Sequence, residues 1–280
     1  MKSIDEVDLM DDIFMNLVAS DPDVGEDVCR ILLSVLLQKK IGKVTVHAQR
    51  MIPGSGIDSR GIRLDVEVDE RGNDGRIANI YDIEPHKNKE TDFGRMLRFR
   101  QAKIDSRNMK RNDNDFSHLP DLYIILITDT DYFGLDCMLY TLKVSCVEYP
   151  ELEYEDGLRF LYFYTGGTKG GSESVRNMLK YIQNSKADSV VDEATKELDE
   201  YVGNVRRDPE IRGDYMTFGD RIDWEKKMSL EEGIEQGIEQ GKIEIITGML
   251  RKGKTVEEVS ELCGVDLALV LKAKETMQLV

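Results

Sequence analysis

Cysteine is scarce in the chain, and the few cysteines stand far apart. The four cysteines form no Cys-x-x-Cys spacing, so neither a disulfide framework nor a cysteine zinc site is indicated. A long apolar run is also missing, and residues 1–12 are acidic. Both features argue against a signal peptide or a membrane span. We therefore expect a protein of the reducing cytoplasm that makes no contact with a membrane.

Positive charge is the second shortage. The chain of 280 residues has a net charge of −16, which disfavours nucleic-acid binding because phosphate contacts need lysine and arginine. The deficit is uneven, since nine basic residues stand against three acidic ones between Lys87 and Arg111. Hydrophobic residues make up 40% of the chain, and its length allows one ordinary domain with a smaller appendage.

An Asp-Gly pair, Asp74-Gly75, divides two strand-like runs. It predicts a two-residue type I′ turn, and a turn of that length places Asp65 directly opposite Glu84 on one face of the sheet. Two carboxylates at such close range favour a shared proton or a bound cation, and a divalent metal ion is our first interpretation. A longer turn would shift the register, and a shift of one residue would separate the two acids.

The alternation of apolar and polar residues agrees with that register. One face of the predicted hairpin collects Ile62, Leu64, Val66, Val68, Ile77, Tyr81 and Ile83. The other face collects Arg63, Asp65, Glu67, Asp82, Glu84 and His86. So much charge on one face indicates either plain solvent exposure or a functional site.

The remaining elements predict an α/β fold. Residues 43–49 indicate the first strand, and the apolar run 122–128 is typical of a buried parallel strand. A helix over about 92–108 would connect the hairpin to that strand as a βαβ crossover. Residues 138–147 and 158–165 allow a further hairpin. We expect three segments: a catalytic domain over 1–185, a helical extension over 186–230 and a tail over 231–280.

These residues carry a resemblance to a known family. The segments Arg63-Leu64-Asp65-Val66 and Asp82-Ile83-Glu84-Pro85-His86, the arginine-rich stretch 95–105 and the strand 123–131 resemble the nuclease core of the PD-(D/E)XK superfamily. More narrowly, the chain is similar to the Rpn-like recombination-promoting nucleases, also described as PD-(D/E)XK family transposases. The likeness extends through Tyr132-Phe133-Gly134, 140–148, Tyr215-Met216-Thr217 and 231–241. It implies a mixed four-stranded sheet flanked by helices, and a DNA endonuclease that promotes recombination.

Phosphodiester chemistry points to the same acids. Cleavage needs a hard divalent ion that polarises the phosphoryl oxygen and activates water, and carboxylates from two strands suit Mg²⁺ or Mn²⁺. Asp65 and Glu84 are the predicted ligands. The resemblance adds Glu26, an acid on the first core helix, although an acid in a first turn also interacts with the helix dipole.

The residue two places after Glu84 departs from the family pattern, which has Gln or Lys where this chain has His86. His86 returns to the face of Glu84 and can position water, contact phosphate or ligate a softer ion, or it can be a bystander. Lys87 points away from a regular strand, but Pro85 can mark a bulge that turns it inward. The departure leaves open a catalytically degenerate, acidic interaction protein that keeps the nuclease fold.

The basic stretch supplies the predicted DNA contacts. On the helix expected over 92–108, Arg95, Arg98 and Lys103 lie away from the apolar positions, and Arg63 belongs to the polar face of the hairpin. We interpret them as phosphate-binding residues because they follow the third strand. The alternative is an ordinary solvated helix face.

The tail repeats a glycine every four residues. On a helix, Gly233, Gly237 and Gly241 fall along one stripe. Because glycine weakens an isolated helix, the stripe indicates either close contact between helices, as in a homodimer, or a flexible linker. The last residues predict two short helices around a tight turn, but acids outnumber bases there, so a small packing module is favoured over a DNA-reading helix-turn-helix.

Overall fold

The computed structural model describes residues 2–53, 61–87, 92–109 and 114–278. The chain divides into two compact units between Met216 and Thr217, within helix α6. The expected boundary near residue 185 falls inside the first unit. Helix α5 follows that boundary, and its Leu198 and Val202 belong to the main hydrophobic core, so residues 1–185 and part of the predicted extension form one body.

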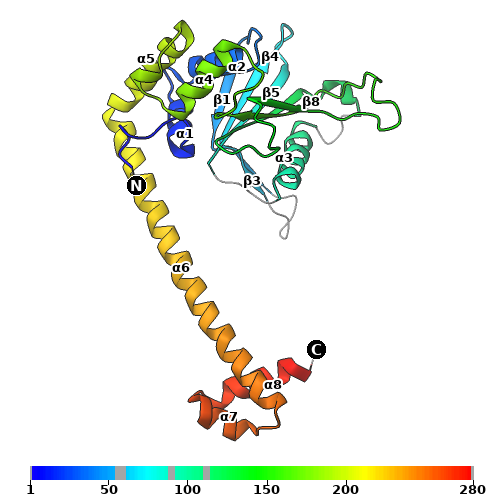
Figure 1. The fold of residues 1–280 in the computed structure, drawn as a ribbon, viewed down its shortest axis with the longest axis vertical. Helices are drawn as coiled ribbons and strands as arrows, with labels where there is room; N and C mark the ends of the chain where they lie inside the picture. The colour runs from blue at the N-terminus through cyan, green and yellow to red at the C-terminus, as the bar shows by residue number, and fades with distance from the viewer. Residues whose placement is uncertain (1, 54–60, 88–91, 110–113, 279–280) are drawn as a thin grey trace. The chain divides into compact units, whose positions relative to one another are not determined.

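The first unit is an α/β structure built on a mixed sheet. Its elements are α1 (Asp12–Ser20), α2 (Gly25–Leu36), β1 (Val44–Ala48), β2 (Met51–Ile52), β3 (Ile62–Arg63), β4 (Val66–Arg71), β5 (Ile77–His86), α3 (Phe93–Asn108), η1 (Phe116–His118), β6 (Asp121–Thr128), β7 (Leu139–Leu142), β8 (Leu158–Tyr164), α4 (Glu173–Gln183), η2 (Ala187–Ser189), α5 (Glu193–Arg207) and the start of α6 (Pro209–Arg251). Among the described residues, six strands form one sheet in the order β1-β4-β5-β6-β8-β7 (Figure 1). The predicted α/β class is confirmed, with a larger sheet than the four strands expected.

The pairing of the strands changes direction in the middle of the sheet. β1, β4 and β5 are antiparallel neighbours, whereas β6 runs parallel to both β5 and β8. The nearly continuous apolar sequence of β6 suits this position, because a strand between two parallel neighbours is buried on both faces. The expected hairpin of β7 and β8 is present, with β8 beside β6 and β7 at the edge of the sheet.

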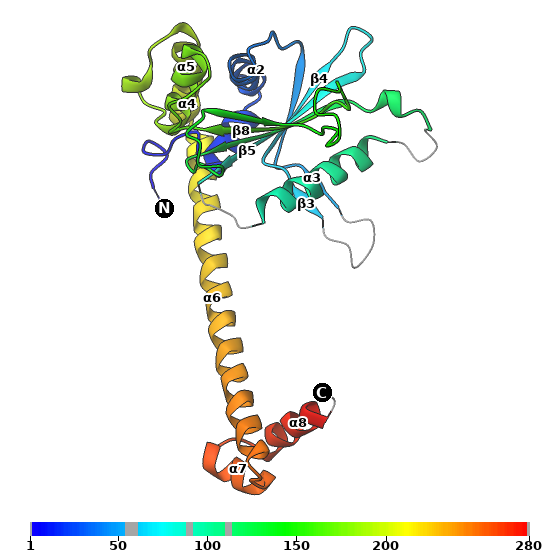
Figure 2. The same cartoon turned by 45° about the vertical axis from the view of Figure 1, so that its right-hand side comes forward.

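Helices cover both faces of the sheet (Figure 2). Val66, Tyr81 and Ile83 pack in the core that also contains α1 and α2, while Ile80 and other side chains of the opposite face pack with α3. Ile62, Leu64 and Ile77 were expected beside Val66, but Leu64 lies in the cluster under α3 and the other two pack against it. A bend at Asp65 interrupts the strand and moves the preceding residue to the other side, and Ile77 lies beyond a register shift in the pairing of β4 with β5.

The turn between β4 and β5 differs from the predicted one. The backbone N–H of Gly72 donates to the carbonyl of Arg76 at 2.9 Å, and the N–H of Gly75 donates to the carbonyl of Gly72 at 3.0 Å. The loop therefore contains three residues, of which Gly75 adopts a positive φ of 79°. The predicted two-residue turn is wrong.

A β-bulge restores the predicted register. Because of the longer loop, Arg71 pairs one residue away from its predicted partner, with Ile77. A register shift between Glu70 and Arg71 then returns Glu70 and the residues before it to their predicted partners. Beyond the bulge, Val66 faces Ile83, as a two-residue turn would have required. The loop and the bulge cancel, so the register that brings Asp65 towards Glu84 is confirmed although its assumed cause was wrong.

The second unit contains the end of α6 with α7 (Val256–Cys263) and α8 (Leu267–Gln278). These helices share a small core of Ile246, Val256, Val259, Val270 and Ala273. The capping box of Thr255 and Glu258 is present, and Gly264 ends α7 with a φ of 60°. The glycine stripe of residues 233–241 is helical, and no described heavy atom lies within 4 Å of a Cβ placed on those glycines. Dimerisation through this stripe stays a prediction.

The turn glycine gives the first test. A Cβ on Gly75 would meet no atom within 4 Å, so alanine there is penalised only by its positive φ. We expect Gly75→Ala to lower the free energy of unfolding by about 1 kcal/mol. Gly94 has equally open space but a helical backbone, so Gly94→Ala should leave stability unchanged or raise it by up to about 1 kcal/mol. Urea unfolding of both variants checks this, and equal effects would contradict the turn geometry.

Candidate functional site

Five carboxylates line the side of β4 and β5 that faces α3. They alternate along the two strands, and we call them the acidic face: Asp65, Glu67, Asp69, Asp82 and Glu84. All except Asp65 are at most 5% exposed, and Asp65 is half-buried. The alternation expected from the sequence therefore holds for Val66, Val68, Tyr81 and Ile83, which face away from these acids, but not for the apolar residues that pack under α3. The face is covered by α3, however, so each buried charge needs a partner inside the protein.

Arg100 supplies the central partner of the acidic face. This arginine of α3 is only 7% exposed. Its Nε donates to Oδ2 of Asp82 at 3.1 Å, its Nη2 donates to Oε1 of Glu84, and its Nη1 donates to the carbonyl of Arg63 at 3.3 Å. Burial raises the pKa of Asp82, while the positive charge of Arg100 acts in the opposite direction. One guanidinium thus joins α3 to β5 of the six-stranded sheet and to β3, which pairs with β2 in a separate two-stranded sheet.

Sequence reasoning missed Arg100, although the helix carries a signal for it. The buried positions of α3 are Phe93, Leu97, Arg100 and Ile104, which follow the three-and-four spacing of a helix face. Arg100 therefore stands in the apolar stripe. A charged residue at such a position indicates a buried partner of opposite charge.

Asp65 and Glu84 lie beside each other where β4 begins and β5 ends. The backbone N–H of Asp65 donates to Oε1 of Glu84 at 3.0 Å. Burial raises the pKa of the Asp65 carboxyl to about 6; the charge of Arg100 lowers it in part, and the carboxylates of Asp12 and Asp82 raise it. Further negative charge at Asp65 is consequently disfavoured, and a cation there is favoured.

An acid of the first helix acts on this site, but it is not the one expected. Asp12 is the first residue of α1, and its charge contributes to the raised pKa of Asp65. Glu26, the candidate chosen from the resemblance, is exposed in the first turn of α2. Burial is the main cause of the raised pKa of the Cys29 thiol, and the charge of Glu26 adds to it. The sequence signal for Asp12 was its place directly after Asp11, the N-cap of α1.

The other end of the acidic face contains a group that could hold a metal ion. His47 of β1, Glu67 and Asp69 each offer a ligand atom, and these atoms lie within 4.8 Å of one another. Two arginines already contact the group: Nη1 of Arg50 binds Oε1 of Glu67, and Nη2 of Arg107 lies 2.7 Å from its Oε2. A metal ion in this group would therefore share its acids with guanidinium groups.

His86 and Lys87 leave the end of β5 in different directions. The ring of His86 lies 5.9 Å from that of Phe93 in α3, whereas Nζ of Lys87 lies 3.5 Å from Oδ1 of Asp8 in the N-terminal segment. The pairing of β5 with β6 runs unbroken through Pro85 and His86. The bulge considered at Pro85 is thus absent from the described pairing, and Lys87 points away from the α3 side as a regular strand requires.

The predicted DNA-contacting residues lie on or near the outer side of α3. Arg95 is highly exposed, with Nη1 at 3.6 Å from Asp92, and Arg98 is exposed. Nζ of Lys103 lies over the ring of Phe99 at 5.4 Å. The side chain of Arg63 is exposed. Three further cations of the basic stretch lie outside the described residues: Lys89, Lys110 and Arg111.

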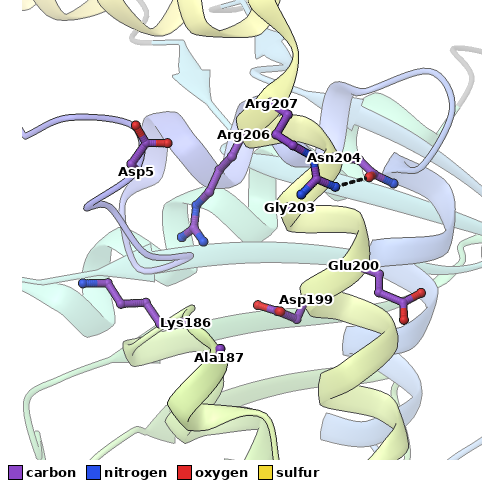
Figure 3. Close-up of a pocket in the computed structure, with 9 residues that line it drawn as sticks. All are labelled: Asp5, Lys186, Ala187, Asp199, Glu200, Gly203, Asn204, Arg206 and Arg207. Atoms are coloured by element: carbon purple, nitrogen blue, oxygen red, sulfur yellow. Dashed lines mark hydrogen bonds between the residues drawn. The ribbon is translucent and has the colours of Figure 1, made fainter.

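A separate cavity of about 620 Å³ lies between the N-terminal segment and α5 (Figure 3). Its charged lining is mixed, and none of it comes from the acidic face. Arg206 in this lining donates to the carbonyls of Ser185 and Val7, at 2.7 Å each. Arg207 donates to the side chain of Asn204. The contacts of Arg206 join α5 to the N-terminal segment and to Ser185, whereas that of Arg207 lies within α5. We assign the cavity no part in the chemistry of the acids.

Comparisons with known proteins give no match: no family model matches the chain, nor does any curated protein or solved structure. Among the described residues, no helix has the length and apolar character needed to cross a membrane.

The raised pKa of Asp65 predicts that its ionised carboxylate destabilises the folded protein. The folded protein binds this proton more tightly than the unfolded chain, whose pKa is near 3.8, so stability from this group falls as pH rises from about 4 to about 6. Above that window the charged carboxylate costs on the order of 2 kcal/mol. Asp65→Asn should therefore raise the melting temperature at pH 7.5 in chelator, and raise it less at pH 4.5.

The exposed Glu151 provides the matched control, because Glu151→Gln removes the same charge without relieving burial. It should change the melting temperature little at either pH. A loss of stability in Asp65→Asn at pH 7.5 would contradict the unfavourable environment assigned to the carboxylate.

Proposed function

We propose that the protein is a metal-dependent DNA endonuclease of the Rpn-like, PD-(D/E)XK type, with recombination as the process it serves. The observation that carries the proposal is the pair Asp65 and Glu84 at adjoining ends of two antiparallel strands. The order of elements supports it: α2, three antiparallel strands, α3 and then a strand parallel to the third. That order is the one implied by the resemblance of the sequence.

The donor set fits Mg²⁺ or Mn²⁺, because carboxylate oxygens are the ligands that hard divalent ions prefer. The raised pKa of Asp65 supports the same assignment, since a divalent cation would relieve the crowding of acids there. When bound, such an ion supplies an electrophile for the phosphoryl oxygen and an acidified water. Arg100 contacts the same oxygen of Glu84 as the N–H of Asp65, and in this proposal it orients the carboxylate.

The remaining roles follow from where the side chains lie. His86 follows Glu84 on the α3 side of β5, where an imidazole can hydrogen-bond water or a phosphate oxygen. Lys87 is paired with Asp8, so His86 is the preferred substitute for the Gln or Lys of the family pattern. The exposed Arg63, Arg95 and Arg98 are assigned to the DNA backbone, where cations fix the register of a duplex without reading its sequence.

A second candidate is an interaction protein that keeps the fold without cutting. One observation favours it: the guanidinium of Arg100 is a buried cation that already pairs with Asp82 and Glu84. In this case Arg100 neutralises the acids permanently, and the net charge of −16 suits a protein partner better than a duplex.

Cleavage assays separate the two candidates. We expect the purified full chain to nick or linearise plasmid DNA with Mg²⁺ or Mn²⁺, and to stop when chelator is added. Asp65→Ala and Glu84→Ala should each reduce the rate at least about a hundredfold, because each removes a ligand of the ion. Glu151→Gln is the control for charge. Cutting by either alanine variant at the parent rate would refute the site, and no metal-dependent cutting in the parent would favour the interaction protein.

Binding at different salt concentrations tests the role of α3. Arg95→Glu combined with Arg98→Glu should weaken DNA binding and reduce the slope of log affinity against log salt by about two, because each lost phosphate contact removes nearly one. The control is Arg176→Glu with Lys180→Glu, two exposed cations four residues apart on α4. The control changes the net charge equally, so equal slopes in both variants would leave α3 with no specific role.

A further inference from the structure

A second group of ligands lies on the acidic face, away from Asp65 and Glu84. β1 and β4 are antiparallel, and His47 is the direct partner of Glu67. Asp69 lies two residues further along β4 and therefore on the same side. Nε2 of His47 is 3.0 Å from Oδ2 of Asp69, and a ligand atom from each of the three residues lies within 4.8 Å of the other two.

The buried carboxylates of this group are incompletely satisfied. Asp69 is 5% exposed and Glu67 is fully buried. Oδ1 of Asp69 and Oε2 of Glu67 accept no hydrogen bond from the described residues. Oε2 of Glu67 does have Nη2 of Arg107 at 2.7 Å, so Oδ1 of Asp69 is the clearer example of a carboxylate oxygen without a partner. A buried carboxylate oxygen without a donor is costly, and a bound ion is one of the few partners that satisfies it.

The two carboxylates of this group are contacted by two guanidinium groups, those of Arg50 and Arg107. With both acids ionised, the two arginines balance their charge, so a divalent cation fits the group only if one guanidinium leaves. Buried charge is costly unless it is paired.

Arg50 contacts both carboxylates of the group. Its Nη1 binds Oε1 of Glu67 and lies 3.9 Å from Oδ2 of Asp69. The side chain is 33% exposed and follows the end of β1, so the guanidinium can move to solvent without opening the core. Arg107 belongs to α3, and its Nη2 contacts the other carboxylate oxygen of Glu67, Oε2, at 2.7 Å.

We propose that His47, Glu67 and Asp69 bind a zinc-class divalent ion, and that the ion takes the place of the Arg50 guanidinium. One imidazole nitrogen with two carboxylate oxygens suits Zn²⁺ or a similar transition metal, whereas Mg²⁺ prefers oxygen ligands alone. Three protein ligands leave a position for water, as in open zinc sites. The inference does not depend on the proposed cleavage, because it uses neither Asp65 nor Glu84.

Metal titration of the full chain tests the site. With Zn²⁺ followed by calorimetry, and with Co²⁺ followed by visible absorption, we expect one bound ion and no thiolate charge-transfer band. Mg²⁺ should not compete at the same concentration. His47→Gln should weaken binding roughly tenfold or more. The control is His118→Gln, since His118 also lies beside an aspartate, at 3.4 Å from Asp115, but in no such group of three among the described residues.

The decisive variant is Arg50→Gln. If the guanidinium competes with the ion, its removal should strengthen Zn²⁺ binding, whereas a purely structural ion pair predicts no gain. Circular dichroism melting confirms that each variant is folded, and Arg50→Gln keeps the test valid if a ligand variant unfolds. Unchanged affinity in His47→Gln, or affinity in Arg50→Gln that is equal to or weaker than that of the parent, would overturn the proposal.

Discussion

The contact between Arg100 and the acids beneath it is the interaction on which the central part of the first unit depends. Buried carboxylates on neighbouring strands repel each other, and they persist only where a cation offsets the repulsion. The Arg100 guanidinium supplies that cation for Asp82 and Glu84, and its third nitrogen holds the carbonyl of Arg63. The same contact fixes α3 over the sheet. Arg100 therefore both neutralises the buried acids and positions the helix that covers them.

The acidic face divides into two ends with different electrostatic states. At one end burial raises the pKa of Asp65 to about 6, and the nearby acids Asp12 and Asp82 add to the effect. At the other end Glu67 and Asp69 are held by arginine and histidine side chains. A cation at the first end would relieve repulsion, whereas a cation at the second must compete with Arg50. The two ends consequently offer a cation different electrostatic environments.

Local periodicity was enough to predict much of the fold, and long-range contacts account for what was missed. The strands β1, β5 and β6 and the helix α3 follow from two-residue and four-residue patterns, which a short window of sequence contains. Asp12 was missed because its approach to Asp65 joins a helix and a strand that are distant in the chain. The burial of the acids was missed because hydropathy treats arginine as a surface residue, so Arg100 was not expected in the stripe that covers them.

The compensation between the hairpin loop and the β-bulge has a consequence for how the protein can vary. A bulge lets one strand carry an extra residue without moving the residues that follow it. Here the bulge lies between the hairpin tip and the acids, so it separates the register of the acids from the length of the tip. A change in tip length can be absorbed at the bulge before it reaches the carboxylates. Residues can therefore be inserted, deleted or replaced at the hairpin tip while the carboxylates of β4 and β5 keep their positions relative to one another.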